Sequence, residues 1–113
     1  MKIAIPVAKG RLSVHFAHVE EFALFDVDME NKTIVGQKTY PAPEDHSPGA
    51  LPKWLIDNGV TMVIVYGMGS RAIAILEQKG IKVLTGAPSE EPEIIVQSYL
   101  SGTLEFGDNF CEH

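Results

Sequence analysis

TMVIVY at 61–66, a run rich in β-branched residues, limits the possible folds more than any other segment of this chain. An uninterrupted apolar run of this kind is typical of a parallel strand that is covered on both faces. GMGS follows at 67–70 and leads into a helical pattern, and IKVLTG at 81–86 is a further strand. Because alternating strands and helices imply parallel strands with right-handed crossovers, the second half of the chain predicts an α/β fold.

The first half of the chain predicts three strands. KIAIPV at 2–7 is the first, EFALFDVD at 21–28 is apolar on both faces until its end, and the more polar KTIVGQKTY at 32–40 suits a sheet edge. MEN at 29–31 forms a turn, so the second and third strands make a hairpin. The turn-rich segment 41–50, with its three prolines, separates this hairpin from the first helix.

Three helices complete the pattern. The first carries Pro52 in its first turn and stops at Gly59, the second stops near Gly80, and the last, at about 90–101, is closed by Gly102. The order βββαβαβα predicts one mixed sheet of five strands in the spatial order 3-2-1-4-5, with the second strand antiparallel to the rest. We therefore expect a three-layer, ribonuclease-H-like α/β fold.

Length and composition set the class of protein. The 113 residues fit one domain, which we place at 1–104, followed by a C-terminal tail at 105–113. The net charge of −6 and the lack of a basic stripe argue against a nucleic-acid partner. No apolar stretch has the length of a membrane span, the N-terminus has no signal-peptide layout, and there is one cysteine, Cys111. We expect a cytoplasmic protein without membrane contact.

The predicted strand directions bring distant loops together. Four of the five strands point the same way, so the loops at 8–19, 41–50, 67–70 and 86–89 share one rim of the sheet. His15, His18 and His46 then gather beside the start of the second helix. The order of strands reverses between the first and the fourth strand, and ligands of open α/β sheets favour such a switch point.

The histidines allow two interpretations. Neutral imidazole is a common ligand of iron, copper and zinc, and three rings on one rim would suit a metal site. Alternatively, His15 bonds to the loop backbone while His18 and His46 are solvated. The spacing H-x-x-H and the single cysteine do not form a closed structural zinc site.

GMGSRA at 67–72 is a candidate anion cradle. Glycines let main-chain N–H groups approach a ligand, Ser70 can cap the helix, and Arg71 can add a forked donor. The segment lacks the lysine of a P-loop and the third glycine of a dinucleotide fingerprint. The alternative is a tight strand-to-helix turn with an N-cap and no ligand.

Two further features bear on chemistry. Cys111 and His113 in the tail are either a soft metal-ligand pair or part of a frayed terminus. The central strands carry no carboxylate for magnesium, there is no Gly-x-Ser-x-Gly elbow, and Cys111 has no rigid base beside it. We therefore expect no catalytic activity.

Several segments together resemble the dinitrogenase iron-molybdenum cofactor biosynthesis family, whose members are small nitrogenase accessory domains and their relatives. The most specific are S-x-H-F at 13–16 and G-M-G-x-R-A-I-x-x-L at 67–76, which is followed by G-I-K-V. The match extends to about residue 104. The resemblance implies the ribonuclease-H-like fold and a carrier of the iron-molybdenum cofactor or of another iron–sulfur or molybdenum–sulfur cluster.

The resemblance also assigns residues. It makes His15 and His46 candidate metal ligands, to which we add the tail pair Cys111 and His113. The family usually has glycine and a basic residue after the phenylalanine, where this chain has Ala17 and His18, so His18 is expected to tune charge. The cluster-binding set is then Ser13, His15, His18, Gly67, Gly69, Ser70 and Arg71.

The implied partners are proteins that donate and accept the cluster. The alternative function is a regulatory module that binds a small phosphate or nucleotide at the Gly67–Arg71 loop. The polar third strand, as an exposed edge, is compatible with a monomer or a weak homodimer.

Overall fold

The computed structural model describes residues 1–13, 19–43 and 50–104. In chain order its elements are β1 (Lys2–Ala8), β2 (Arg11–Leu12), β3 (Glu21–Asp28), β4 (Thr33–Pro41), α1 (Ala50–Asp57), β5 (Met62–Ile64), α2 (Ser70–Gln78), β6 (Lys82–Leu84) and α3 (Pro92–Ser101). Within the described residues, no helix has the length and apolar character needed to cross a membrane.

The sheet has the predicted order and directions. Its strands run β4-β3-β1-β5-β6, with β3 antiparallel to both neighbours and β1, β5 and β6 parallel. This confirms the mixed sheet inferred from the chain order. The ribonuclease-H-like class itself stays a prediction.

The sheet has six strands, and the prediction of five was wrong. The extra strand β2 turns back onto β1, pairing Val7 with Leu12 and Ala8 with Arg11. The two residues between them, Lys9 and Gly10, have φ angles of 55° and 78°. Two successive positive φ angles make the kind of tight turn that closes a two-residue hairpin. The segment 8–19, expected to be a loop, therefore begins with a short hairpin.

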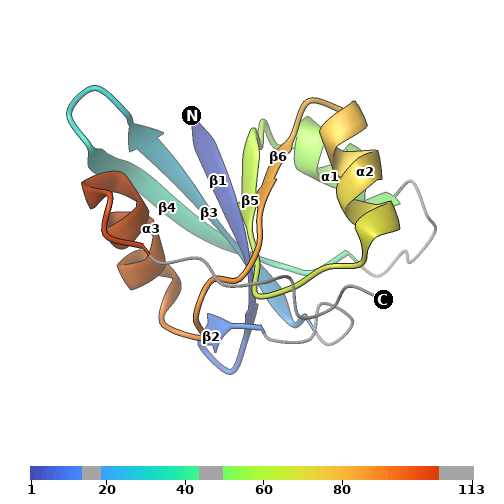
Figure 1. Ribbon diagram of the computed structural model, residues 1–113, viewed down its shortest axis with the longest axis horizontal. Coiled ribbons are helices and arrows are strands. Elements are labelled where there is room, and N and C mark those ends of the chain that lie inside the picture. The colour runs from blue at the N-terminus through green and yellow to red at the C-terminus, as the bar shows by residue number, and fades with distance from the viewer. Residues whose placement is uncertain (14–18, 44–49, 105–113) are drawn as a thin grey trace.

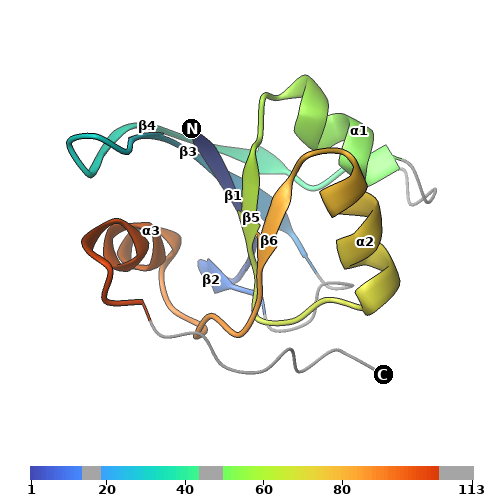
Figure 2. The same ribbon diagram turned by 45° about the horizontal axis from the view of Figure 1, so that its top comes forward.

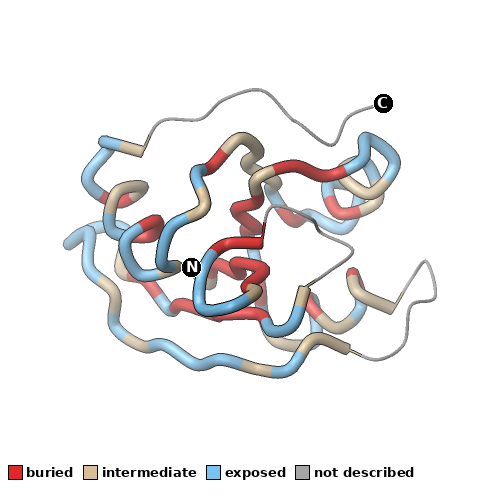
Figure 3. The backbone as a smooth tube through the Cα atoms, turned by 90° about the horizontal axis from the view of Figure 1, so that it is seen from below, coloured by how far each residue is buried: buried red, intermediate tan, exposed pale blue. Residues whose placement is uncertain are grey.

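Helices cover both faces of the sheet, so the fold has three layers (Figures 1 and 2). One face packs against α3 through Ile3, Phe25, Ile64 and Ile95. The other packs against α1 and α2, with Phe22, Leu55, Val63 and Leu76 in its core. Because helices cover both faces, the central side chains of β1, β3 and β5 are buried and apolar on both faces. These buried residues form the middle of the molecule (Figure 3).

Near Pro6, the paired strands β1 and β5 separate. The ladder between β1 and β5 pairs Ile3 with Met62 and Ala4 with Val63, and it extends no further. Pro6 has no N–H to offer, and its carbonyl oxygen instead accepts a hydrogen bond from the Ser13 N–H at 2.9 Å. Beyond Ala4, therefore, β2 and Ser13 lie along β1 on the side that β5 has left, which is the predicted switch point.

Candidate functional site

The described loops at the carboxyl ends of β1 and β6 are joined by hydrogen bonds. The Leu12 N–H donates to the Glu90 carbonyl at 2.9 Å, and the Ser89 hydroxyl donates to the Leu12 carbonyl at the same distance. The Arg11 guanidinium reaches the Ser89 carbonyl at 3.3 Å. Sequence reasoning missed this link, because its partners lie more than 70 residues apart and carry no motif.

A second link ties the loop after β6 to the loop after β5. The Gly86 N–H donates to the Tyr66 carbonyl at 2.8 Å, and the Ala87 N–H donates to the Val65 carbonyl at 3.2 Å. The residues that lead into α2 therefore lie beside the loop that is bonded to β2. For these described parts, the predicted common rim is confirmed.

His15, His18 and His46 lie outside the described residues, as do Cys111 and His113. The described residues that flank the first two segments are nevertheless adjacent, since the Ala42 N–H donates to the Glu20 carbonyl at 3.0 Å. Val19 and Ala42 pack against the same apolar cluster as Ala72, at the start of α2. The end of the first histidine segment and the beginning of the second therefore lie next to each other.

Of the predicted cluster-binding set, Ser13 and the GMGSR residues are described. Ser13 is buried, with 6% of its surface exposed, and its N–H is held by Pro6. Gly67 is buried as well, whereas Gly69, Ser70 and Arg71 are exposed. The exposed part of the loop is therefore the beginning of α2.

The prediction that Ser70 caps α2 was wrong. Gly69 is the N-cap, with φ −60° and ψ 146°, and no side chain bonds to the cap. Ser70 is instead the first helical residue. The helical ladder starts with the bond from the Ile73 N–H to the Gly69 carbonyl at 3.1 Å. The N–H groups of Ser70, Arg71 and Ala72 therefore have no acceptor within the helix, and the first turn contains no acidic residue.

Gly69, which precedes these N–H groups, has open space at its own Cβ position. Its φ angle is available to any residue, so the backbone does not require a glycine there. A Cβ atom built at this position would meet nothing within 4 Å. N–H groups without helical acceptors at a helix start, together with the helix dipole, can suit an anion.

Metal ligands are a separate question. Among the described residues, no group of three or more His, Cys, Asp or Glu side chains is arranged to hold a metal ion. All four histidines and the cysteine fall in the other segments, so His15, His46, Cys111 and His113 stay predictions as ligands.

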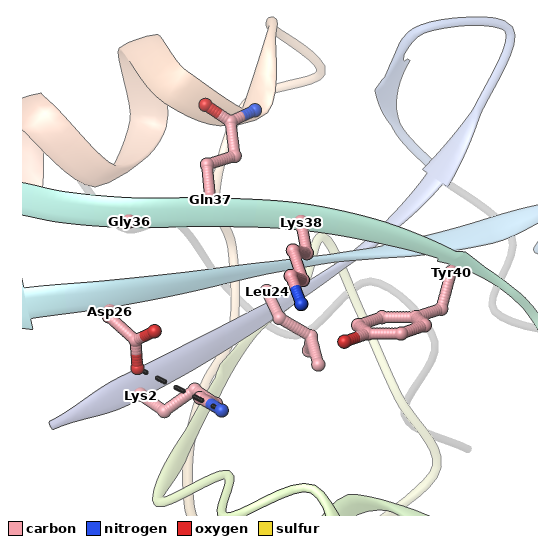
Figure 4. Close-up of a pocket in the computed structure, with 7 residues that line it drawn as sticks. All are labelled: Lys2, Leu24, Asp26, Gly36, Gln37, Lys38 and Tyr40. Carbon is pink, nitrogen blue, oxygen red and sulfur yellow. Dashed lines mark ion pairs between the residues drawn. The ribbon is translucent and has the colours of Figure 1, made fainter.

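A hollow of about 280 Å³ lies away from the rim, on the same face of the sheet as α1 and α2, over β1, β3 and β4 (Figure 4). Its lining residues are Lys2, Leu24, Asp26, Gly36, Gln37, Lys38 and Tyr40. The Lys2 ammonium lies 3.8 Å from the Asp26 carboxylate and donates to the Asn58 carbonyl at 3.0 Å. Sequence reasoning did not find this hollow, because it depends on the register of three strands.

Comparison with known proteins gives consistent matches over nearly the whole chain. The family described as dinitrogenase iron-molybdenum cofactor matches residues 1–102. An uncharacterized protein of Methanocaldococcus jannaschii is 33% identical over 109 residues, covering 93% of this chain and 90% of that protein.

Two solved structures have the same fold. The crystal structure of PH0822 is 27% identical, covers 94% of both chains and has a TM-score of 0.84. The apo form of the orange protein from Desulfovibrio gigas is 18% identical, with a TM-score of 0.69 over 96% of this chain and 93% of that one. The similarity to the orange protein supports the fold alone.

Proposed function

This chain belongs to the dinitrogenase iron-molybdenum cofactor family, and from that premise we propose that it binds and carries an anionic metal–sulfur cluster. The cargo would be the iron-molybdenum cofactor or an iron–sulfur precursor, taken from a donor protein and passed to an acceptor in the cytoplasm. The chain performs no catalysis in this proposal.

The observation that supports the proposal most directly is the open start of α2. Three main-chain N–H groups have no acceptor within α2, and Gly69, which precedes them, is exposed and has open space at its Cβ position. A bulky anion can accept hydrogen bonds from these groups and interact favourably with the positive end of the helix dipole. Arg71, exposed in the first turn, adds a positive charge.

The metal ligands in this proposal are His15 and His46, whose segments are flanked by the adjacent residues Glu20 and Ala42. The adjacency of Glu20 and Ala42 supports bringing both segments to one place. Cys111 and His113 are additional candidate ligands. His18 supplies charge, and Ser13 fixes the start of the first segment through its bond to Pro6. Few ligands suit a carrier, because cargo held by a complete ligand shell is harder to hand on.

Anaerobic reconstitution tests this function. The protein is incubated with ferrous iron, sulfide and molybdate, desalted, and examined by visible absorption and metal analysis. We expect a chromophore that His15→Ala and His46→Ala each weaken at least severalfold. Gln97→Ala, a polar exposed position on α3, is the control and should keep the full signal. A wild-type protein that stays colourless and free of metal would refute the proposal.

A second candidate is the phosphate- or nucleotide-binding regulatory module. It is favoured by Arg71, which makes no ion pair within 1–13, 19–43 and 50–104, beside the open helix start. A thermal-shift screen with nucleotides separates the two functions. Stabilisation by a nucleotide that is lost in Arg71→Ala, kept in Lys79→Ala at the other end of α2, and independent of the histidines would favour the second candidate.

A further inference from the structure

The strand β4 forms one edge of the sheet, and within the described chain it pairs with β3 alone. It is nine residues long, from Thr33 to Pro41, and its side chains alternate between exposed and half-buried over much of its length. A free edge of this length offers a row of main-chain donors and acceptors to another strand.

The hydrogen-bond pattern identifies which groups of β4 face outward. The Ala42 N–H bonds to the Glu20 carbonyl, and antiparallel ladders alternate between bonded and non-bonded pairs. Tyr40 and Lys38 therefore direct their main-chain groups toward β3, whereas Thr39 and Gln37 direct theirs away from the sheet. Gln37 and Thr39 provide the free N–H and C=O groups of this edge.

The free edge is bounded at both ends. Pro41 has no N–H, and at the other end the register shifts between Asp26 and Val27, so that Val35 is an extra residue in β4. Val35 is 68% exposed, the largest value among the exposed large hydrophobic residues of the described chain. An incoming strand therefore has a short regular segment, 36–40, next to an exposed β-branched side chain.

We propose that this edge pairs with the β4 edge of a second copy of the chain, antiparallel, with Gln37 opposite Gln37. Identical edges pair about a two-fold axis, which makes such an interface self-complementary. A pairing centred on Lys38 would place two ammonium groups opposite each other, which is unfavourable. Centring on Gln37 instead places Lys38 opposite Gly36 of the second copy and Thr39 opposite its Val35.

Charge complementarity supports this register. Gly36 pairs with Asp26, and a Cβ atom built at Gly36 would lie 3.4 Å from the Asp26 carboxylate. Since neighbouring strands are about 5 Å apart, Lys38 of the second copy lies two strand spacings from Asp26. No side chain at Gly36 stands between them. Figure 4 shows that Lys38 and Asp26 lie on the same side of the sheet as Leu24, whereas Gln37 points to the other side.

The Asp26 side chain is 57% exposed and already lies 3.8 Å from Lys2. In the pairing, its carboxylate would lie between two lysines, one from each copy. The two-fold axis produces this contact twice. Because exposed ion pairs are weak and screened by salt, the dimer should be weak and should dissociate further as ionic strength rises.

Sedimentation of the full chain up to millimolar concentration tests the interface. We expect reversible dimerisation that Gln37→Pro weakens at least tenfold, because proline removes the outward N–H and leaves the ladder to β3 intact. Gln37→Ala is the matched control and keeps the dimer. Circular dichroism confirms that each variant is folded. A wild-type protein that stays monomeric, or a dimer that Gln37→Pro does not affect, would overturn the proposal.

Charge exchange tests the register. Lys38→Glu alone and Asp26→Lys alone should each weaken association, since like charges then face each other across the axis. An equimolar mixture of the two variants should associate again, because both contacts in the mixed dimer are complementary. A mixture that associates no better than its components would overturn the register.

Amide hydrogen exchange adds a residue-level readout. The N–H groups of Gln37 and Thr39 should become protected as protein concentration rises. Those of Lys38 and Tyr40, already bonded to β3, should not change. Equal behaviour of the two sets would also contradict the proposed edge.

Discussion

Two helices, α2 and α3, begin at the same rim of the sheet, and their first turns differ in charge. Both α2 and α3 have extended N-cap residues, Gly69 and Glu91, without a side-chain cap. The first turn of α3 contains Glu93 and begins with Pro92, whereas the first turn of α2 has no acidic residue and contains Arg71. The start of α3 thus has its own negative charge, and the start of α2 leaves room for one from outside. This difference is why we propose the start of α2, and not that of α3, as the anion site.

The two starts are also anchored differently, and the largest expected effect comes from the anchor of α2. Met68 is 1% exposed and lies in the core between the sheet and α1 and α2. Met68→Ala should lower the free energy of unfolding by about 2–5 kcal/mol, because it removes buried methylene groups and leaves a cavity. Chemical denaturation measures this loss in the free energy of unfolding. Ile94→Ala, at an exposed position of α3, should change stability far less. Equal losses would mean that Met68 does not anchor the loop through burial.

The anchor before α3 is a hydrogen bond, so its removal should cost less. Ser89→Ala deletes the donor to the Leu12 carbonyl, and we expect a loss of about 0.5–1.5 kcal/mol in denaturation. Ser101→Ala, at an exposed serine that donates to the Gln97 carbonyl within α3, serves as the comparison and should cost less. A Ser89 variant as stable as the wild type would show that the main-chain bond between Leu12 and Glu90 holds this link alone.

Exchanging the charges of the two helix starts tests the comparison itself. Ser70→Glu gives α2 a carboxylate and should stabilise the protein by about 0.3–1 kcal/mol while reducing binding of an anionic cluster. Glu93→Gln should destabilise by a similar amount and leave cluster binding unchanged. Denaturation and anaerobic reconstitution measure the two effects separately. If Ser70→Glu binds cluster as well as the wild type, the start of α2 is not the anion site.

The sequence allowed the sheet order to be predicted, because TMVIVY and the βα alternation admit few topologies. It did not reveal β2, since Arg11–Leu12 is too short for a periodic pattern and its turn uses a positive φ at Lys9, a residue that rarely adopts one. The rim followed from strand directions alone. The contact of Ser89 with Leu12 and the hollow at Lys2 and Asp26 depend on register between distant segments, which no local pattern encodes.

The turn between β3 and β4 contains a carboxylate that main-chain N–H groups bind, as we propose for an anion at α2. The Asp28 carboxylate accepts hydrogen bonds from the Glu30 and Asn31 N–H groups at 3.0 and 3.2 Å, and from the Asn31 side chain at 2.7 Å. The bond from the Asn31 side chain, followed by the one from its N–H, lowers the pKa of Asp28 below its ordinary value. Adjacent main-chain donors therefore stabilise the charged form of a carboxylate even where it is exposed.

The smallest expected effect is a change in that pKa. Asn31→Ala removes the side-chain donor and should raise the pKa of Asp28 toward its ordinary value while keeping both main-chain bonds, and NMR titration of the carboxyl carbon measures it. Because the folded pKa is the lower one, the stabilisation is present above the unfolded pKa and is lost as pH falls through the folded value. The wild type should therefore lose more stability than Asn31→Ala on acidification through this range. A pKa that returns fully to its ordinary value in Asn31→Ala would mean that the main-chain donors contribute nothing, and it would weaken the case for the N–H groups of α2 as an anion site.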